Sequence, residues 1–267
     1  MRAVAERVPL PGPRVSLPGL LQNVPAVPAP AADGTSFASG RPAIARPIVL
    51  VHGTRTSSTI WAAQVEALRR SGHPTVAIDL PGHGARADER FTLDGALAAI
   101  DDAVASCTQP PLLVGLSLGG YTALAYAGRH EERVAGVVLA GCSTEIRGKP
   151  VSLYRRASHH VTRWLGLGKG SWHVVTDMLT ALAGYSPLAD LRRLLVPVWL
   201  VNGARDPLRI DERRYLRAVP RARLTVVPRA GHDVNSHAPA AFNRVLLDAL
   251  HELAAHARPP ARGAAYA

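Results

Sequence analysis

The sequence has little cysteine, few aromatic residues and no long apolar run, and each shortage excludes a class of protein. Two cysteines, Cys107 and Cys142, cannot build a disulfide framework, and no CxxC pair or cysteine–histidine cluster offers a metal site. Aromatic residues make up only 5% of the chain, so alanine, valine and leucine must fill the core. Prolines, glycines and a glutamine interrupt the longest uncharged stretch, residues 103–128, which argues against a membrane-spanning helix.

The amino-terminal region also lacks the apolar segment of a secretory signal. Prolines at positions 9, 11 and 13 and the charge of Arg14 interrupt any such segment. We therefore expect a cytoplasmic protein. A length of 267 residues, with 47% hydrophobic and 19% charged residues, is typical of a globular chain with one large domain or two small ones.

Lysine is nearly absent, although the formal net charge is +11. Only Lys149 and Lys169 are lysines, and the other 29 cations are arginines dispersed along the chain. The sequence has no cation-rich run and no aromatic pattern for stacking nucleobases. It predicts no specific nucleic-acid partner, although a basic surface attracts polyanions loosely at low salt.

Composition divides the chain into an arm, a core, an insertion and a tail. Seven of the first thirty residues are prolines, so we expect residues 1–43 to be an extended or disordered arm. Residues 44–142 and 191–256 form the expected core. Residues 143–190 hold no clear strand and predict a small helical lid, and residues 257–267 predict a frayed tail.

Short apolar runs alternate with amphipathic stretches along the core. The expected strands are 47–51, 75–78, 112–116, 134–140, 198–201 and 224–227. Except at 75–78, their apolar residues are continuous rather than alternating, which is typical of strands buried on both faces of a parallel sheet. The expected helices lie at 58–70, at 93–104, at 118–129 and around 242–253. The prediction is an α/β fold with a mostly parallel, doubly wound sheet flanked by helices.

One serine lies where a tight turn joins a predicted strand to a predicted helix. The sequence Gly-Leu-Ser-Leu-Gly begins at Gly115 and places Ser117 directly after the strand. In this context a G-x-S-x-G segment is typical of a nucleophile elbow, whose glycines relieve crowding around a strained serine. A serine used in this way needs a base, and the base needs a carboxylate to orient it.

The expected acid and base follow two later strands. Asp206 lies in Asn-Gly-Ala-Arg-Asp-Pro after the strand that ends at Val201, and His232 lies in Ala-Gly-His-Asp after the strand that ends at Val227. Both positions are past the carboxyl ends of strands, where an open α/β sheet gathers its site. The alternatives are Asp79 and Asp233 for the acid. His52 and His83 are expected to order loops.

Two backbone N–H groups are expected to bind an oxyanion. One belongs to Leu118, at the start of the helix after Ser117, and the other to Thr54, in the loop after the first strand.

Together these segments resemble the α/β-hydrolase superfamily over about residues 44–256. The matching pieces start at Val51 (VHGTRTSSTIW), Asp79 (DLPGHG), Gly115 (GLSLGG), Asn202 (NGARDP) and Ala230 (AGHD). The resemblance implies an α/β-hydrolase fold and a serine hydrolase that needs no cofactor and no metal. The proline-rich first 43 residues depart from the family pattern, because they do not show its opening hairpin.

The expected reaction is hydrolysis of a small-molecule carboxylic ester, lactone or thioester through an acyl-enzyme on Ser117. Two alternatives stay open, namely a C–C bond hydrolase or lyase on the same fold and a non-enzymatic receptor with vestigial turnover. The residues leave the acyl group, the leaving group and the oligomeric state undecided.

The predicted lid is rich in cations. Residues 143–176 contain one anion, Glu145, and six cations, which are Arg147, Lys149, Arg155, Arg156, Arg163 and Lys169. With Arg55 near the pocket mouth they would favour an anionic substrate, although solvated arginines without a role are the alternative. Trp164 and Trp172 are candidate substrate contacts or lid core.

Overall fold

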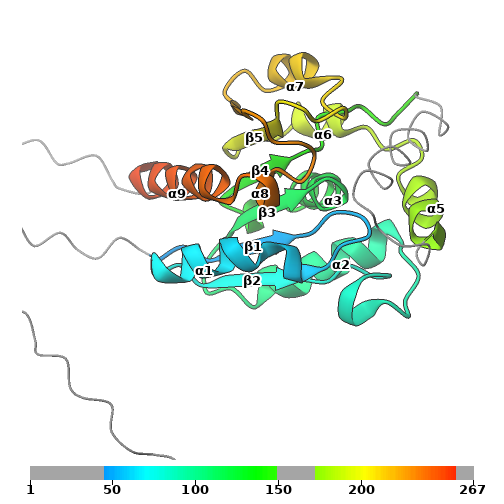
Figure 1. Cartoon of the computed structure of the whole chain (residues 1–267), viewed down its shortest axis with the longest axis horizontal. Helices are drawn as coiled ribbons and strands as arrows, with labels where there is room; N and C mark the ends of the chain where they lie inside the picture. The colour runs from blue at the N-terminus through cyan, green and yellow to red at the C-terminus, as the bar shows by residue number, and fades with distance from the viewer. Residues whose placement is uncertain (1–44, 149–171, 257–267) are drawn as a thin grey trace, which may run out of the picture. The chain divides into compact units, whose positions relative to one another are not determined.

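The computed structural model describes residues 45–148 and 172–256, and its centre is a six-stranded sheet. The predicted arm, the tail and residues 149–171 of the predicted lid lie outside the described residues. The strands are β1 (Ile48–Val51), β2 (Thr75–Ile78), β3 (Leu112–Leu116), β4 (Gly136–Ala140), β5 (Val198–Gly203) and β6 (Arg223–Val227). Their order is β2-β1-β3-β4-β5-β6, and every neighbouring pair is parallel (Figure 1). This arrangement confirms the predicted fold class.

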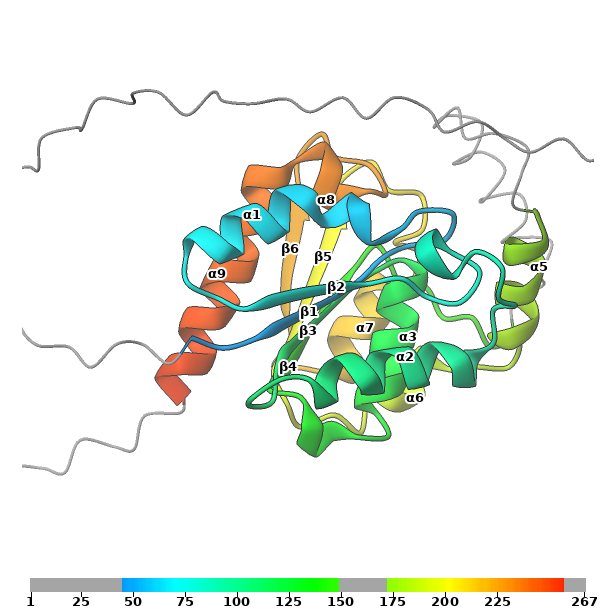
Figure 2. The same ribbon diagram turned by 90° about the horizontal axis from the view of Figure 1, so that it is seen from below.

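Helices cover both faces of the sheet. Those before β4 are the 3₁₀ turns η1 (Ser58–Trp61), η2 (Gly84–Arg86) and η3 (Glu131–Arg133) and the helices α1 (Ala62–Arg70), α2 (Leu93–Ala105) and α3 (Leu118–Ala127). Those after β4 are α5 (Trp172–Ala181), α6 (Pro187–Leu191), α7 (Glu212–Ala218), α8 (Val234–His237) and α9 (Pro239–His256). Figure 2 shows α1 and α9 on one face and α2 and α3 on the other.

Each face of the sheet has its own apolar core. Ile48 and Leu50 of β1 belong to the core under α1 and α9, whereas Val49 and Val51 belong to the core under α2 and α3. This division follows from the alternation of side chains along a strand. Strands buried in this way need apolar residues at every position, which explains the continuous runs in the sequence.

The outer strands are less buried than the inner ones. All residues of β1, β3, β4 and β5 are buried, whereas β6 is mostly half-exposed. The prediction that residues 224–227 are buried on both faces is therefore wrong. The reason is position, because β6 is an edge strand with a neighbour on one side only.

Candidate active site

Ser117 occupies a strained turn between β3 and α3. Its backbone angles are φ 53° and ψ −114°, outside the regions that residues with a side chain prefer. The Ser117 N–H donates a hydrogen bond of 2.7 Å to the carbonyl of Ala140, which fixes the turn against β4. A Cβ atom at Gly115 would lie 2.2 Å from the Gly119 carbonyl oxygen, so the turn requires glycine there. This geometry is that of a nucleophile elbow.

Asp206 and His232 meet at the same edge of the sheet. Nδ1 of His232 lies 3.0 and 3.1 Å from the two carboxylate oxygens of Asp206, and the Asp206 side chain is fully buried. The two loops are joined directly, because the Arg205 N–H donates to the carbonyl of Ala230 at 2.9 Å. Gly203 permits this approach, since a Cβ there would lie 2.1 Å from the Gly231 oxygen.

The surroundings of His232 favour its protonated form. Burial alone would lower the pKa of His232, but its hydrogen bond to the Asp206 carboxylate and the charges of Asp206 and Asp233 outweigh burial and raise that pKa above its ordinary value. The chain after β4 passes beside the ring, because a Cβ at Gly141 would lie 3.3 Å from Nδ1 of His232. The imidazole is therefore held in one orientation by Asp206 and by backbone.

The loop after β1 and the first turn of α3 border the serine. Gly53 passes close to Ser117, since a Cβ at Gly53 would lie 3.4 Å from the Ser117 Cβ. Within the described part of the chain, no hydrogen bond uses the N–H of Thr54 or that of Leu118. The first turn of α3 packs against the end of β1, because a Cβ at Gly119 would lie 2.1 Å from the Val51 oxygen. Both N–H groups therefore remain available near the elbow.

His52 and His83, the other histidines in loops near this edge, contact the backbone of those loops. Nε2 of His52 accepts the Leu80 N–H at 3.0 Å, and its Nδ1 lies 2.8 Å from the Gly53 carbonyl, so the ring orders this loop. Burial lowers the pKa of His52 to about 4, which keeps the ring neutral. Nδ1 of His83 lies 3.0 Å from the Pro81 carbonyl.

Asp79 anchors the loop after β2. Its carboxylate accepts the N–H groups of Ser58 and Ala85 at 2.6 and 2.8 Å. Burial raises the pKa of Asp79, but these backbone hydrogen bonds outweigh burial and lower the pKa below its ordinary value. Asp206, rather than Asp79 or Asp233, forms the hydrogen bond with His232.

Helix α5, within the predicted lid, lies against two loops at this edge of the sheet. The Thr54 hydroxyl donates to the sulfur of Met178 at 2.9 Å, and Arg90 forms a two-pronged ion pair with Asp177. A Cβ at Gly82 would lie 3.4 Å from a methyl group of Val174. Met178 could not be identified from the sequence, because it lies in no motif and only the tertiary fold brings it to Thr54.

Of the other predicted site residues, some lie in the part of the chain that the structure describes and some lie outside it. Arg55 lies in the loop beside Thr54 with a positive φ of 62°. Arg147 lies in the described part of the predicted lid, whereas Lys149, Arg155, Arg156, Arg163, Trp164 and Lys169 lie outside the described residues. Trp172 begins α5, and its side chain lies outside the description.

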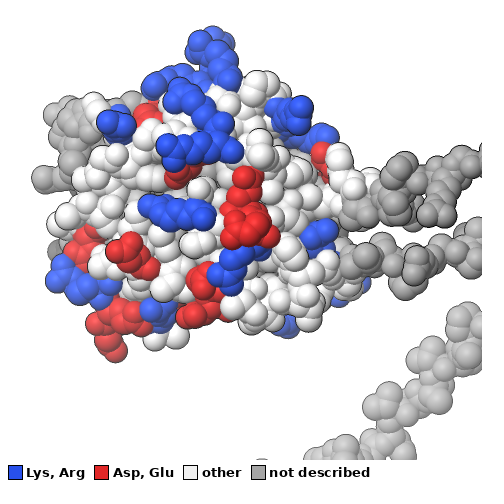
Figure 3. Space-filling view, turned by 180° about the vertical axis from the view of Figure 1, so that it is seen from behind, with Lys and Arg blue, Asp and Glu red and all other residues white. Residues whose placement is uncertain are grey.

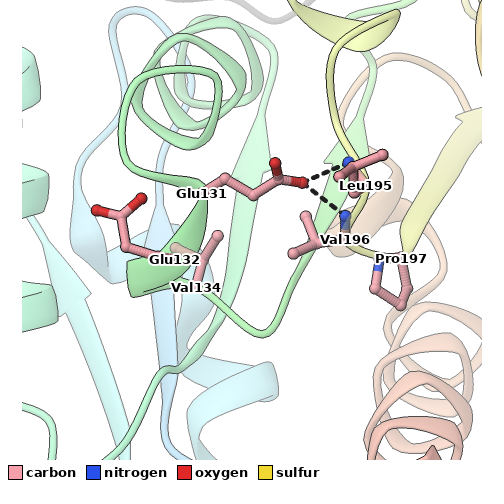
Figure 4. Close-up of a pocket in the computed structure, with 6 residues that line it drawn as sticks. All are labelled: Glu131, Glu132, Val134, Leu195, Val196 and Pro197. Atoms are coloured by element: carbon pink, nitrogen blue, oxygen red, sulfur yellow. Dashed lines mark hydrogen bonds between the residues drawn. The ribbon is translucent and has the colours of Figure 1, made fainter.

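A shallow pocket lies at the opposite edge of the sheet, before β4 and β5 begin. It is lined by Glu131, Glu132, Val134, Leu195, Val196 and Pro197 (Figure 4). One carboxylate oxygen of Glu131 accepts the N–H groups of Leu195 and Val196, so this side chain closes the turn before β5. The pocket therefore lies at the amino ends of the strands, whereas Ser117 follows the carboxyl end of β3.

The described residues lack two further features. No three His, Cys, Asp or Glu side chains converge there as the ligands of a metal ion would. Likewise, none of the helices at 45–148 and 172–256 has the length and apolar character needed to cross a bilayer.

Comparison of the sequence with known proteins relates this chain to one family. A family model described as "Alpha/beta hydrolase family" matches residues 48–245. A pimeloyl-acyl-carrier-protein methyl ester esterase of Neisseria meningitidis serogroup A is 30% identical over 240 residues, covering 74% of this chain and 75% of the relative.

Solved structures show the same fold. A thermophilic esterase from Thermogutta terrifontis has a TM-score of 0.63 at 23% identity and covers 78% of this chain and 90% of its own. An enol-lactonase from Burkholderia xenovorans has a TM-score of 0.62 at 23% identity, with coverages of 78% and 92%. The family model and the parallel sheet together show that this chain belongs to the alpha/beta hydrolase family and is a hydrolase.

Proposed function

We propose that this chain is a serine hydrolase that cleaves carboxylic esters, lactones or thioesters through an acyl-enzyme on Ser117. The observation that carries the proposal is the contact between Nδ1 of His232 and the buried carboxylate of Asp206, at the sheet edge where Ser117 stands on a strained turn. The 30% identical relative is named as an esterase of a methyl ester, which supports the ester class.

In this proposal each residue has one task. When His232 is neutral and its Nδ1–H donates to Asp206, Nε2 carries no proton and can take one from the Ser117 hydroxyl. The Ser117 Oγ then forms a bond to the carbonyl carbon, and the electron pair of the C=O bond moves to the oxygen. The N–H groups of Leu118 and Thr54 would stabilise the resulting oxyanion.

The intermediate then collapses. The C=O bond re-forms, the bond to the leaving group breaks, and His232 gives its proton to that group. Water enters, His232 removes its proton, and the same sequence transfers the acyl group from Ser117 to water. Asp206 stays ionised throughout and holds the imidazole in the required tautomer.

The activity should depend on the protonation of His232. His232 acts as a base only when it is neutral, so kcat/KM should rise with pH and reach half its maximum at the pKa of the free enzyme's histidine. Because Asp206 and Asp233 raise that pKa, we expect the midpoint above about 6.5, the ordinary histidine value. A pH profile of kcat/KM on a non-ionising ester measures it, and a midpoint below the ordinary value would contradict this role.

The described surface near the acid loop is cationic. Arg213, Arg214 and Arg217 of α7 are exposed, whereas Asp211 is buried. Figure 3 shows blue side chains gathered at the top, where α7 lies in Figure 1. Such a surface attracts anionic substrates, and salt weakens the attraction.

We propose that residues 143–190 form a lid and that the preferred substrate carries negative charge.

A panel of p-nitrophenyl esters with matched neutral and carboxylate-bearing acyl groups tests the proposal. We expect release of nitrophenol together with an equal amount of carboxylic acid, and a preference for the anionic ester that shrinks at high salt. Binding of the esters without turnover would instead support a receptor. Turnover only of substrates with a scissile C–C bond would support the lyase or C–C hydrolase alternative.

A further inference from the structure

A buried polar cluster joins the chain after β4 to the loop that carries Asp206. The Asp211 N–H donates to the Ser143 carbonyl at 3.0 Å, and the Glu145 N–H donates to the Asp211 carboxylate at 2.9 Å. Ser143, Thr144, Glu145 and Asp211 are all buried. Buried polar groups are costly unless they are hydrogen-bonded, so these contacts fix the two segments against each other.

The cluster reaches Asp206 through one residue. The backbone N–H of Leu208 donates to Oδ1 of Asp206 at 2.8 Å. The carbonyl of the same Leu208 accepts a hydrogen bond from the Thr144 hydroxyl. Thr144 therefore holds the residue whose backbone N–H contacts the proposed catalytic acid, although Thr144 does not itself contact that acid.

The cluster also reaches α3, α7 and α6. The Thr144 carbonyl accepts the hydroxyls of Tyr121, on α3, and Tyr215, on α7, at 3.1 and 3.0 Å. Oε2 of Glu145 accepts the N–H of Leu188, at the start of α6, at 3.1 Å. Residues 143–145 thus connect the helix that begins after Ser117, the loop that carries Asp206 and both ends of the predicted lid.

We propose that Thr144 and Asp211 are positioning residues, which hold the Asp206 loop in register with His232 and tie it to both ends of the insertion between β4 and β5. The kinetic part of this inference rests on the proposed function, whereas the structural part does not. The charges that raise the pKa of His232 are those of Asp206 and Asp233, so substitution of Thr144 removes neither of them.

The test compares Thr144→Val, which keeps the shape and removes the hydroxyl, with Thr144→Ser, which keeps the hydroxyl. The ring of His232 is titrated by NMR in the full-length protein, and its signal is identified by its loss in His232→Gln. We expect Thr144→Val to lower the pKa of His232, because Asp206 moves out of register, and Thr144→Ser to restore the wild-type value. On a p-nitrophenyl ester, kcat should fall about 10–100-fold at unchanged KM.

A second pair uses Asp211 in case Thr144→Val fails to fold. Asp211→Ala should reproduce the loss, whereas Asp211→Asn should restore most of the activity, because its amide oxygen can still accept the Glu145 N–H. Equal losses in both Asp211 variants would overturn the inference, since charge rather than position would then be responsible.

Other outcomes separate this inference from the proposed function. A Thr144→Val protein with a lower melting temperature but unchanged His232 titration and kcat would show that the cluster serves stability alone, and the inference would be overturned. If the wild type turns over no ester but Thr144→Val still shifts the His232 titration, the inference stands and the proposed function fails.

Discussion

Ser117→Ala is expected to lower kcat for a p-nitrophenyl ester by about 10⁶ while leaving the protein folded, in line with loss of the nucleophile in a serine protease. The hydroxyl is the only group that the substitution removes, and alanine keeps the Cβ atom that serine already carries at the strained φ of 53°. No other described residue stands on an elbow of this kind, so nothing there replaces the lost nucleophile.

A fluorophosphonate probe gives a second measurement of the same substitution. It should add once to the wild type and not to Ser117→Ala. Ser236→Ala is a matched control, because Ser236 is an exposed serine of α8 close in sequence to His232, and it should label and turn over as the wild type does. Labelling of Ser117→Ala at the wild-type rate would exclude Ser117 as the nucleophile.

Asp206→Asn is expected to lower kcat by about 10⁴, the scale found when the acid of a serine protease triad becomes an amide. The amide can offer an N–H to Nδ1 of His232, and this favours the tautomer whose Nε2 carries the proton and cannot act as a base. The fold should survive, since the Leu208 N–H still finds an oxygen at this position. Steady-state kinetics and a melting curve measure the two effects.

Asp233→Asn is the matched control for the acid. Asp233 follows His232 directly and acts on it by charge, but Nδ1 of His232 makes its hydrogen bond with Asp206. We expect Asp233→Asn to lower the pKa of His232 slightly and to keep most of kcat. A large loss in Asp233→Asn with near-native turnover in Asp206→Asn would reverse the assignment.

The strands could be predicted because each one is a short apolar run between turn residues. The ranges 75–78 and 112–116 agree with β2 and β3 residue for residue. β5 extends beyond the predicted 198–201 to Gly203, because the backbone ladder continues through a buried polar residue. That residue, Asn202, is satisfied by Ser143 at 2.9 Å and by Glu212 at 2.7 Å, which an apolar pattern does not reveal.

Polar residues inside the core were the main feature that the sequence did not disclose. In the predicted helix 58–70, Gln64 is fully buried and Val65 is only half-buried. Gln64 donates to Asn243 and to the Asn235 carbonyl, partners about 170 residues or more away. Such pairings depend on the tertiary fold, and local periodicity carries no signal for them.

The same reason explains what was and was not predicted at the site. Ser117, Asp206 and His232 each lie in a short motif directly after a strand, so chain order and strand ends were enough to place them at one edge. Thr144 and Asp211 lie in no motif, and their contacts join segments more than 60 residues apart.

The most direct test of the account is the mass of the enzyme after mixing with p-nitrophenyl acetate and quenching in acid within one turnover. The account predicts that the intact protein gains one acetyl group and that digestion places it on Ser117. It also predicts no such adduct in Ser117→Ala. Rapid turnover with no covalent adduct, or an adduct on another residue, would contradict the acyl-enzyme mechanism.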